Sequence, residues 1–420
     1  MKHKPLRGKR AAIVVLSSYP ADPRPRRSAD ALVRQGMQVD YICAADGKSP
    51  RREKINGLNV FRVPIQHRRG GKFGYAWEYS AFTLASAAIL AARSLRHRYD
   101  LVFINNMPDV LVASALLSKM FGAKVILDLH DPMPELMMAI FRKDSESKSV
   151  RFLKFLEKWS VARADHLLVP DAACHRALAA RTRADEKISV IMNSPDESLF
   201  SFVPARARPL HGNKPFVAMY HGTLVERNGL QIAIDALARL RDRLPTAQLH
   251  IYGKATPFLE RVMQSVRERA LQNNVLHLGE KSLEQIAAAI DACDIGIVPN
   301  PRNAFTELNM PTRIFEYLAR GKPVIAARTA GIQDYFNEES LLFFEAGSPD
   351  DLAKKIEFAV SSPMEVLAIT GRGQQVYQTH TWKQESQALV RVVQKLLEPQ
   401  EHTKTVGAAL PALETKEIDD

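Results

Sequence analysis

The amino-acid sequence predicts an α/β fold of two doubly wound domains, each built on a mostly parallel sheet. Three observations support this prediction. The chain has 420 residues, more than a single hydrophobic core usually serves. Short apolar, β-branched runs alternate with helix-length segments, which is typical of parallel sheets covered by helices. One break in this alternation, rich in Pro and polar residues, divides the pattern into two halves.

The first half, residues 1–195, contains six runs that are nearly continuous in apolar residues, so we expect strands buried on both faces of a sheet. Its least polar stretch, residues 79–92, is shorter than the roughly 20 residues of a membrane span and is predicted to be a buried helix. The predicted strands are residues 13–16, 39–42, 101–104, 125–127, 166–169 and 188–191, and the predicted helices are residues 26–35, 77–96, 109–121 and 150–163.

The second half repeats the architecture without repeating the sequence. Residues 196–213 are predicted to be a linker, and residues 214–378 a second α/β domain. An amphipathic segment at 379–398 is expected to pack back as a helix, and residues 399–420 lose periodicity and predict a disordered acidic tail. The predicted strands are residues 216–220, 248–252, 275–278, 295–298, 323–326 and 341–344.

Net charge is concentrated in the first domain. The chain carries +12, from 58 Lys and Arg against 46 Asp and Glu, whereas residues 1–98 hold 20 basic and 6 acidic residues, or +14. Such a field attracts nucleic acid, anionic lipid or a phosphorylated substrate. No nucleic-acid module accompanies it, so nucleic-acid binding is not expected. Weak, salt-sensitive association with anionic lipid is the better use of this charge.

The compartment is indicated by cysteine usage and by the N-terminus. The three cysteines, Cys43, Cys174 and Cys293, lie far apart and suggest neither a disulfide framework nor a zinc site. The apolar run at residues 11–16 is too short for the core of a signal peptide. We therefore expect a cytoplasmic protein, with peripheral attachment to the inner face of the cell membrane as an extension of that prediction.

The segment from Glu307 to Ala326 is the sharpest motif in the chain. Pro311 suits the first turn of a helix, and Gly321 suits its C-terminal cap. A helix N-terminus offers free backbone N–H groups to a diphosphate, and Arg313 adds a charge-assisted hydrogen bond. One turn further in, the Glu316 carboxylate can accept hydrogen bonds from adjacent hydroxyls, as on a ribose. The segment therefore predicts a nucleotide site.

Residues 311–326 resemble the donor-binding signature of family 4 retaining glycosyltransferases. The resemblance spans nearly the whole chain, from Tyr19 to about Trp382. It implies the GT-B fold, with two Rossmann-like domains facing a central cleft. In that family the second Glu of an E-x7-E pair binds the nucleotide ribose, and Glu316 matches it.

The first Glu of that pair normally contacts the donor sugar, and its position here is Leu308. Glu307 is displaced by one residue. Either the loop shifts to present Glu307, as a catalytic-site residue, or the backbone amides of Asn309 and Met310 hold the sugar.

Residues 220–229 resemble the family's loop that neutralises the leaving diphosphate. Gly222 would let the backbone approach phosphate. Thr223 stands where many members have Arg, and Asn228 where many have Lys, so Arg227 is the remaining cation of this loop. A positioned cation stabilises the negative charge that develops as the glycosyl–phosphate bond breaks. Lys254, which follows the next predicted strand, is a further candidate donor contact.

Two segments of the first domain supply candidates for the sugar and the acceptor. Residues 125–135 resemble the family's histidine-bearing loop, so His130 is a candidate catalytic residue and Glu135 a candidate acceptor contact. A metal-like His/Asp cluster, or helix capping by Asp131, is the alternative. The loop at residues 22–27 resembles that of a subset of the family with an Asp-Pro-Arg-x-Arg-Arg pattern. The resemblance implies that Arg24 lies where an acceptor phosphate would dock, whereas helix entry at Pro25 is the structural alternative.

These residues predict a glycosyltransferase of the hexosyltransferase type. A nucleotide diphosphate sugar, of UDP or GDP type, is expected to be the donor. A glycan or lipid-linked glycan is expected as acceptor, in surface polysaccharide synthesis. No Asp-x-Asp motif is present, so neither a metal nor another cofactor is predicted. Two alternatives remain: a nucleotide-sugar epimerase, which would convert donor without acceptor, and a non-catalytic partner at a membrane.

Overall fold

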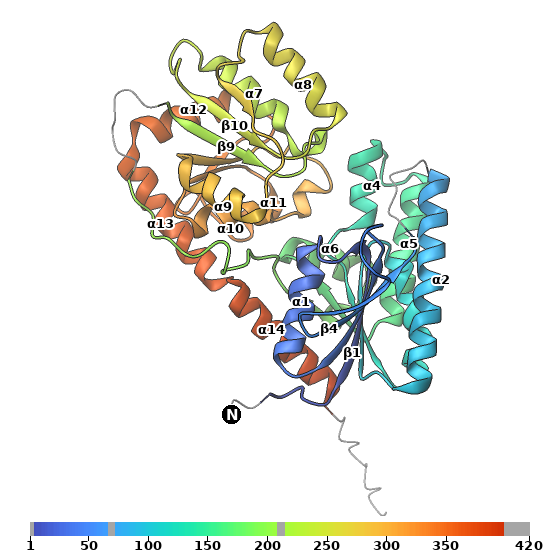
Figure 1. Cartoon of the computed structure of the whole chain (residues 1–420). Helices are drawn as coiled ribbons and strands as arrows, with labels where there is room; N and C mark the ends of the chain where they lie inside the picture. Colours follow the sequence, from blue (N-terminus) through green and yellow to red (C-terminus); the bar gives the residue numbers. More distant parts are fainter. Residues whose placement is uncertain (1–3, 66–71, 208–214, 399–420) are drawn as a thin grey trace, which may run out of the picture.

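The structure, a computed structural model, describes residues 4–65, 72–207 and 215–398. It consists of two α/β lobes, each with a central sheet between layers of helices (Figure 1). The tail expected at 399–420 and part of the linker expected at 196–213 lie outside the described residues. Among those residues, we find no helix with the length and apolar character that a membrane crossing requires.

The N-terminal sheet has eight strands in the order β3-β4-β2-β1-β5-β6-β7-β8, and only the edge pair β3–β4 is antiparallel among the described pairings. Neither strand of this hairpin was predicted, because β3 alternates between exposed and half-buried residues and β4 between buried and half-buried residues, so neither is a continuous apolar run. The strands are β1 (Arg10–Ser18), β2 (Gln38–Ala44), β3 (Arg52–Ile55), β4 (Leu58–Val63), β5 (Leu101–Asn105), β6 (Lys124–Asp128), β7 (His166–Val169) and β8 (Ile188–Val190).

Helices cover both faces of this sheet. On one face, α2, η1 and α5 bury side chains such as Phe82, Leu111 and Val161. On the other face, α1 buries Leu32. The segment expected as one helix at 109–121 is a 3-10 helix followed by a short α-helix. The elements are α1 (Pro23–Arg34), α2 (Lys72–Arg96), η1 (Asp109–Ala115), α3 (Leu116–Met120), α4 (Met133–Phe141), α5 (Lys148–Arg163), α6 (Ala172–Thr182) and η2 (Asp185–Lys187).

The prediction that residues 79–92 form a buried helix is wrong in one respect. These residues lie in α2, and Phe82 and Leu90 are buried against the sheet. Leu84, however, is 71% exposed. Since α2 belongs to the outer layer of its lobe, only one side of the helix contacts the core.

The C-terminal sheet has six parallel strands in the order β11-β10-β9-β12-β13-β14. Helices α7, α8 and α12 bury one face of the sheet, and α9, α10 and α13 bury the other. The elements are β9 (Val217–His221), η3 (Glu226–Asn228), α7 (Leu230–Arg239), β10 (Gln248–Tyr252), α8 (Pro257–Glu268), β11 (Val275–His277), α9 (Leu283–Ala292), β12 (Ile295–Val298), η4 (Thr306–Leu308), α10 (Thr312–Ala319), β13 (Val324–Ala327), α11 (Ala330–Gln333), β14 (Leu342–Phe344), α12 (Pro349–Ser361) and α13 (Pro363–Thr379).

The last helix, α14 (Trp382–Leu397), returns to the N-terminal lobe, as Figure 1 shows. Thr381 and Gln384 form a capping box at its start, which satisfies backbone N–H groups that have no partner inside the helix. Leu389 and Val393 are buried in the same cluster as Leu32 of α1. The chain therefore ties the two lobes together at its end.

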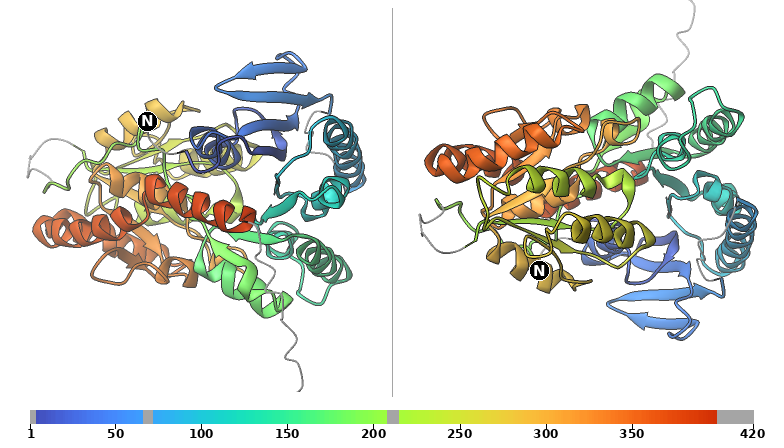
Figure 2. Two further views of the ribbon diagram at one scale, coloured as in Figure 1. Left: turned by 90° about the horizontal axis from the view of Figure 1, so that it is seen from below. Right: turned by 90° about the horizontal axis from the view of Figure 1, so that it is seen from above.

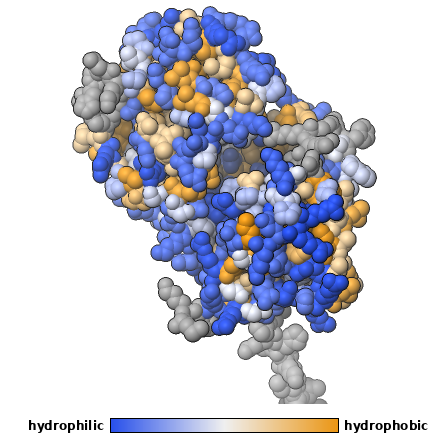
Figure 3. Space-filling model, in the orientation of Figure 1, coloured by the Kyte–Doolittle hydropathy of each residue, from blue (hydrophilic) through white to orange (hydrophobic). Residues whose placement is uncertain are grey.

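Ion pairs from helices and helix ends also join the two lobes. The Arg176 guanidinium on α6 contacts the Asp334 carboxylate beyond α11 at 2.8 Å. At the end of α4, Arg142 pairs with Glu226 of the C-terminal lobe at 2.6 Å. Figure 3 shows a hollow between the lobes. Because ligands of doubly wound sheets bind beyond the carboxyl ends of the strands, the candidate site is sought there.

Candidate active site

The end of β9 and the helix α10 form a hydrogen-bonded cluster. His221, the last residue of β9, lies with its Nε2 atom 2.6 Å from Glu316 Oε2 and its Nδ1 atom 2.9 Å from the Tyr317 hydroxyl. The Tyr317 hydroxyl also donates to the carbonyl of Met219 at 2.9 Å. Gly296 on β12 makes room for Tyr317, because a Cβ there would lie 2.3 Å from its ring. Sequence reasoning missed His221, although its place at the end of a strand was a signal.

The donors and acceptors around the Tyr317 hydroxyl define the role of the His221 ring. Tyr317 has one hydroxyl hydrogen, and a carbonyl oxygen can only accept, so that hydrogen goes to Met219. His221 Nδ1 must then donate to the Tyr317 oxygen. On the other side of the ring, Nε2 lies 2.6 Å from Glu316 Oε2, which is a hydrogen-bonding distance. His221 therefore holds one oxygen of Glu316, and among the described residues no hydrogen bond to the other oxygen is found.

Arg313 lies beside this cluster and braces the loop after β9. Its Nη1 atom donates to the His221 carbonyl at 2.8 Å, and its Nη2 atom donates to Asn300 Oδ1 at 3.2 Å. The guanidinium also lies 4.8 Å from the centre of the Tyr220 ring, a cation–π distance. Part of its donor capacity is thus used within the protein, while its charge stays next to the loop.

The loops after β9 and β10 are in contact. Gly222 has φ +126°, and its amide donates to the Tyr252 carbonyl at 3.1 Å. A Cβ on Gly253 would lie 2.3 Å from the Gly222 carbonyl, so only glycine permits this approach. Thr223 and Lys254 are exposed beside these glycines. Both therefore accompany Gly222 at one edge of the sheet.

Arg227 is half-buried in η3, between Glu226 and Asn228. Asn228 Nδ2 donates to the Thr223 carbonyl at 2.8 Å, which closes the loop onto itself. Gly229 follows with φ +74°, and a Cβ there would lie 1.8 Å from the Pro299 carbonyl. The turn that carries Arg227 is therefore fixed at both ends.

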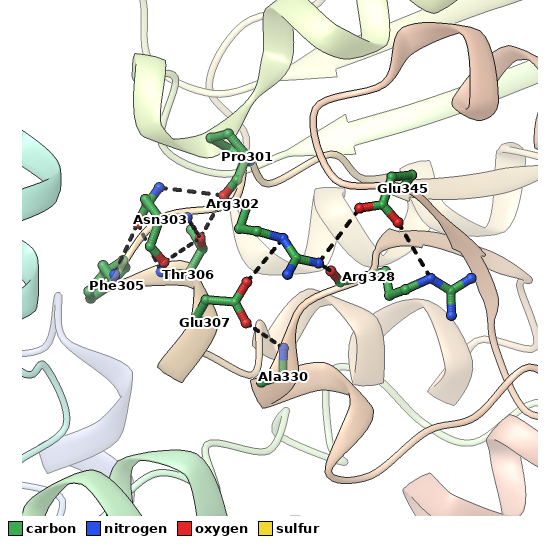
Figure 4. A network of polar contacts seen from close by, with 9 residues as sticks. All are labelled: Pro301, Arg302, Asn303, Phe305, Thr306, Glu307, Arg328, Ala330 and Glu345. Atoms are coloured by element: carbon green, nitrogen blue, oxygen red, sulfur yellow. Dashed lines mark hydrogen bonds and ion pairs between the residues drawn. The ribbon is translucent and has the colours of Figure 1, made fainter.

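Glu307 belongs to a separate network (Figure 4). Its Oε2 atom accepts from the Ala330 amide at 2.8 Å, at the start of α11, and its Oε1 atom lies 3.3 Å from Arg302 Nε. Arg302 also donates to the Arg328 carbonyl at 2.8 Å. The carboxylate thus lies against the loop after β13, and its chemistry toward a sugar stays a prediction.

The structure argues against a sugar contact through the amides of Asn309 and Met310. The Asn309 amide donates to the Thr306 carbonyl at 3.3 Å, and the Met310 amide donates to Asp171 Oδ2 at 3.4 Å. Asp171 comes from the N-terminal lobe, and burial raises the pKa of its carboxyl to about 6. Cys174 next to it donates to the Leu308 carbonyl at 3.3 Å. Both amides are therefore already engaged, one of them across the lobes.

His130 follows β6 in the opposite lobe and is held by a residue that the sequence did not reveal. Asn106 Oδ1 accepts from the His130 and Asp131 amides at 3.2 and 3.4 Å, and Asn106 Nδ2 donates to Asp109 Oδ1 at 3.0 Å. Burial raises the pKa of Asp109 to about 6. Among the described residues, His130 Nδ1 is buried without a hydrogen-bond partner. A buried polar atom of this kind requires an explanation, and a ligand hydroxyl supplies one.

Arg24 and Glu135 occupy interior ion pairs, which argues against the predicted acceptor contacts. Arg24 is 4% exposed, contacts both Asp128 oxygens at 2.7 and 2.8 Å, and donates to a backbone carbonyl at 2.9 Å. Glu135 contacts Arg181 at 2.7 Å, and Arg181 also pairs with Glu157. These partners leave neither side chain directed to solvent. Arg24 instead anchors the end of β6, two residues before His130.

The geometry thus brings Gly222, Thr223, Lys254, Arg313 and Glu316 to one edge of the C-terminal sheet. His130 belongs to the other lobe. In the described parts of the chain, no group of three or more His, Cys, Asp or Glu side chains is suited to a metal ion.

Comparison with known families defines the class of protein. Residues 21–194 match the family described as "Glycosyl transferase 4-like domain", and residues 204–376 match "Glycosyl transferases group 1". Each match covers one lobe. The chain is therefore a glycosyltransferase of the GT-B fold, with a 4-like N-terminal lobe and a group 1 C-terminal lobe, and the predicted fold class is confirmed.

Solved structures and relatives agree with this class. Sucrose-phosphate synthase from Thermosynechococcus elongatus superposes with a TM-score of 0.74 at 18% identity, covering 92% of this chain and 99% of that one. Anabaena Alr3699/HepE, solved in complex with UDP-glucose, gives a TM-score of 0.68 at 17% identity, covering 92% of this chain and 99% of that one. The sulfoquinovosyl transferase SQD2 of Arabidopsis thaliana is 22% identical over 65% of this chain, and the chain spans only about half (52%) of that relative's length.

Proposed function

We propose that this glycosyltransferase moves a sugar from a nucleotide diphosphate donor, of UDP or GDP type, to a glycan or lipid-linked acceptor, with retention of anomeric configuration. The observation that carries this proposal is the contact of 2.6 Å between His221 and Glu316. It presents a carboxylate in fixed orientation next to a glycine loop. A ribose and a diphosphate need these two features side by side.

The donor is proposed to lie along the edge of the C-terminal sheet. Glu316 accepts hydrogen bonds from the ribose hydroxyls through its unpaired oxygen. The loop at Gly222 and the start of α10 receive the diphosphate, with Arg227 and Lys254 as flanking cations. The UDP-glucose complex of the Anabaena protein, which shares the fold, supports a donor of this chemical class.

The reaction is proposed to be a substitution on one face of the sugar. The bond between the anomeric carbon and the diphosphate oxygen breaks, and the acceptor oxygen forms its bond to the same carbon from the same side. The acceptor proton passes to the leaving phosphate oxygen. Arg227 and the helix N-terminus stabilise the charge that develops on the leaving group.

His130 is proposed to contact the transferred sugar from the opposite lobe. Its unpartnered Nδ1 atom supplies one hydrogen-bonding position, and Asn106 holds the backbone on either side of it. Glu307 is retained as a second candidate for the sugar, which requires it to leave the Ala330 amide.

The proposal is tested by measuring donor binding and sugar transfer separately. Thermal-shift screening against UDP and GDP sugars identifies the donor, because a ligand that binds only the folded state raises its stability. Mass spectrometry of reactions with and without acceptor then identifies the product. Conversion of donor alone would instead indicate an epimerase.

The decisive variant is Glu316→Ala, which we expect to abolish transfer and donor binding in a protein that stays folded, with an unfolding free energy lowered by about 2 kcal/mol because the hydrogen bond with His221 is lost. Glu365→Ala is the matched control, because Glu365 is an exposed glutamate on α13 of the same lobe. A fully active Glu316→Ala protein would contradict the proposed site.

A further inference from the structure

Exposed apolar side chains gather on one part of the N-terminal lobe. In the described residues, fourteen large hydrophobic side chains are exposed, and ten of them belong to α2, α3, α4 and α5. Scattered single residues of this kind are ordinary, whereas a concentration on neighbouring helices marks an interaction surface. We call this surface the outer helix face, and define it by Trp77, Leu84, Leu95, Leu116, Leu117, Met120, Ile140, Phe141, Phe152 and Phe155.

Helix α2 presents an uncharged stripe to solvent. Trp77, Leu84 and Leu95 are 76, 71 and 73% exposed, and their separations of 7 and 11 residues place them on one side of a helix with 3.6 residues per turn. The opposite side of α2 buries Phe82 and Leu90 in the core. A helix that is apolar on both sides is atypical of a water-facing surface. Between the three large side chains, the exposed positions are the small residues Ser80, Ala88 and Ala92.

Helix α5 adds aromatic side chains surrounded by positive charge. Phe152 and Phe155 are 58 and 60% exposed, and the exposed residues on the same helix include Lys148, Arg151 and Lys158. This combination is typical of helices that lie in the headgroup region of a bilayer, with apolar side chains inserted and Lys or Arg against anionic lipid.

The helices that carry these residues form one continuous layer. Helices α2 and α5 flank η1 on the same face of the N-terminal sheet, and α3 follows η1 directly. In Figure 2, α2, α3 and α5 stand along one side of the molecule, whereas the end of α4 reaches toward the C-terminal lobe, where Arg142 pairs with Glu226. Figure 3 views this side edge-on, with hydrophobic atoms along the rim of the lower lobe. The exposed side chains of α2, α3 and α5 therefore belong to neighbouring helices in one layer of the lobe.

We propose that the outer helix face binds the surface of an anionic lipid bilayer. The apolar side chains supply contact area, and the flanking basic residues select anionic headgroups. A second copy of the chain fits less well. In a two-fold dimer the outer helix face of one copy would pack against the same face of the other. Lys148, Arg151 and Lys158 of the two copies would then lie in one interface, where their like charges repel.

The position of α4 connects this surface to the site, and this step depends on the proposed function. The helix begins three residues after His130 and ends at Ile140 and Phe141, which are 46 and 42% exposed. At a rise of 1.5 Å per residue, its nine residues span about 13 Å. Arg142, just beyond its end, pairs with Glu226, next to Arg227. A chain docked in this way keeps its site within reach of an acceptor carried by a lipid.

The first experiment is co-sedimentation of the full chain with vesicles of phosphatidylcholine alone, and with phosphatidylglycerol added. We expect binding to the anionic vesicles that weakens as salt is raised. The double substitution Phe152→Ser with Phe155→Ser should weaken it by about tenfold or more. Met364→Ser is the matched control, because Met364 is 67% exposed on α13 of the other lobe, and it should bind like the parent protein.

Trp77 supplies a second measurement. Its fluorescence should shift to shorter wavelength when anionic vesicles are added, because a highly exposed indole enters a less polar medium, and Trp77→Ser should lose this shift. Failure of the parent protein to sediment at low salt, or equal binding by the Phe152/Phe155 variant, would overturn the proposal. A dimer that dissociates on this substitution, without any vesicle binding, would overturn it in favour of self-association.

The two proposals can fail independently. The side chains of the outer helix face are exposed and lie on the other lobe from Glu316, so the double variant should keep the parent unfolding temperature and the parent affinity for UDP or GDP. Loss of vesicle binding with intact nucleotide binding therefore tests the lipid surface alone, and the Glu316→Ala protein, which should still bind vesicles, tests the donor site alone.

Discussion

Replacing His221 with Ala removes the side chain that orients Glu316. The substitution deletes the 2.6 Å contact to Glu316 and the 2.9 Å contact to Tyr317. The Glu316 side chain is only 16% exposed, so water restores little of the lost interaction. A hydrogen bond to a charged group contributes about 1.5–3 kcal/mol. We expect the free energy of unfolding to fall by about 2 kcal/mol.

The effect on the donor follows from the same contact. Without His221, Glu316 is free to change rotamer and must be ordered again when nucleotide binds. Ordering one side chain of this kind costs about 0.5–1.5 kcal/mol, which corresponds to about two- to tenfold weaker binding of UDP or GDP. Glu316→Ala removes the proposed ribose contact itself, so its loss of affinity should be larger.

Isothermal titration calorimetry with UDP and GDP measures these affinities, and urea denaturation measures the stability. The control is His250→Ala, because His250 Nε2 forms a local hydrogen bond with the side chain of Gln248, two residues away on the same strand, at 3.0 Å. Parent-like nucleotide affinity in His221→Ala, together with a loss of affinity in Glu316→Ala, would refute the orienting role of His221.

Arg24→Ala breaks the buried pair of Arg24 and Asp128, and it should lower the free energy of unfolding, measured in urea, by about 3–5 kcal/mol. Arg24→Met combined with Asp128→Leu should recover most of that loss. Parent-like stability of Arg24→Ala would contradict the interior pair. Gly296→Ala places a Cβ 2.3 Å from the Tyr317 ring. It should lower the free energy of unfolding by about 1–3 kcal/mol and weaken UDP or GDP binding in calorimetry. Unchanged affinity would contradict this prediction and show that the ring adapts. Burial raises the pKa of Asp109 from 3.8 to about 6, so its neutral form stabilises the fold at low pH and that contribution is lost as pH rises toward and through 6. Asp109→Asn should therefore add up to about 3 kcal/mol near pH 8 and little near pH 4, and an equal gain at both pH values in urea denaturation would contradict this sign.

The local pattern of apolar residues was sufficient to predict the strands that face the core on both sides. The runs ending near Leu16, Ile104 and Val298 were predicted because burial on both faces demands continuous apolar residues. The hairpin β3–β4 was missed, since the edge strand β3 is partly solvated and β4 alternates buried and half-buried residues, so both lack that pattern. The helix starting after Pro311 was predicted from its proline and from Gly321, which act within one turn of the chain.

The sequence by itself determined the two-domain α/β class and the glycosyltransferase resemblance, and it predicted where the nucleotide loop lies, because each depends on residues that are neighbours in the chain. Only the tertiary structure decided which side chains face the site. His221 and Glu316 are 95 positions apart, and Arg24 meets Asp128 across 104 positions. Such contacts depend on the order of strands in a sheet, and local periodicity carries no record of that order. The same reason explains α2: its periodicity shows an apolar helix, but only the packing of the sheet beneath it leaves Trp77 and Leu84 in contact with solvent.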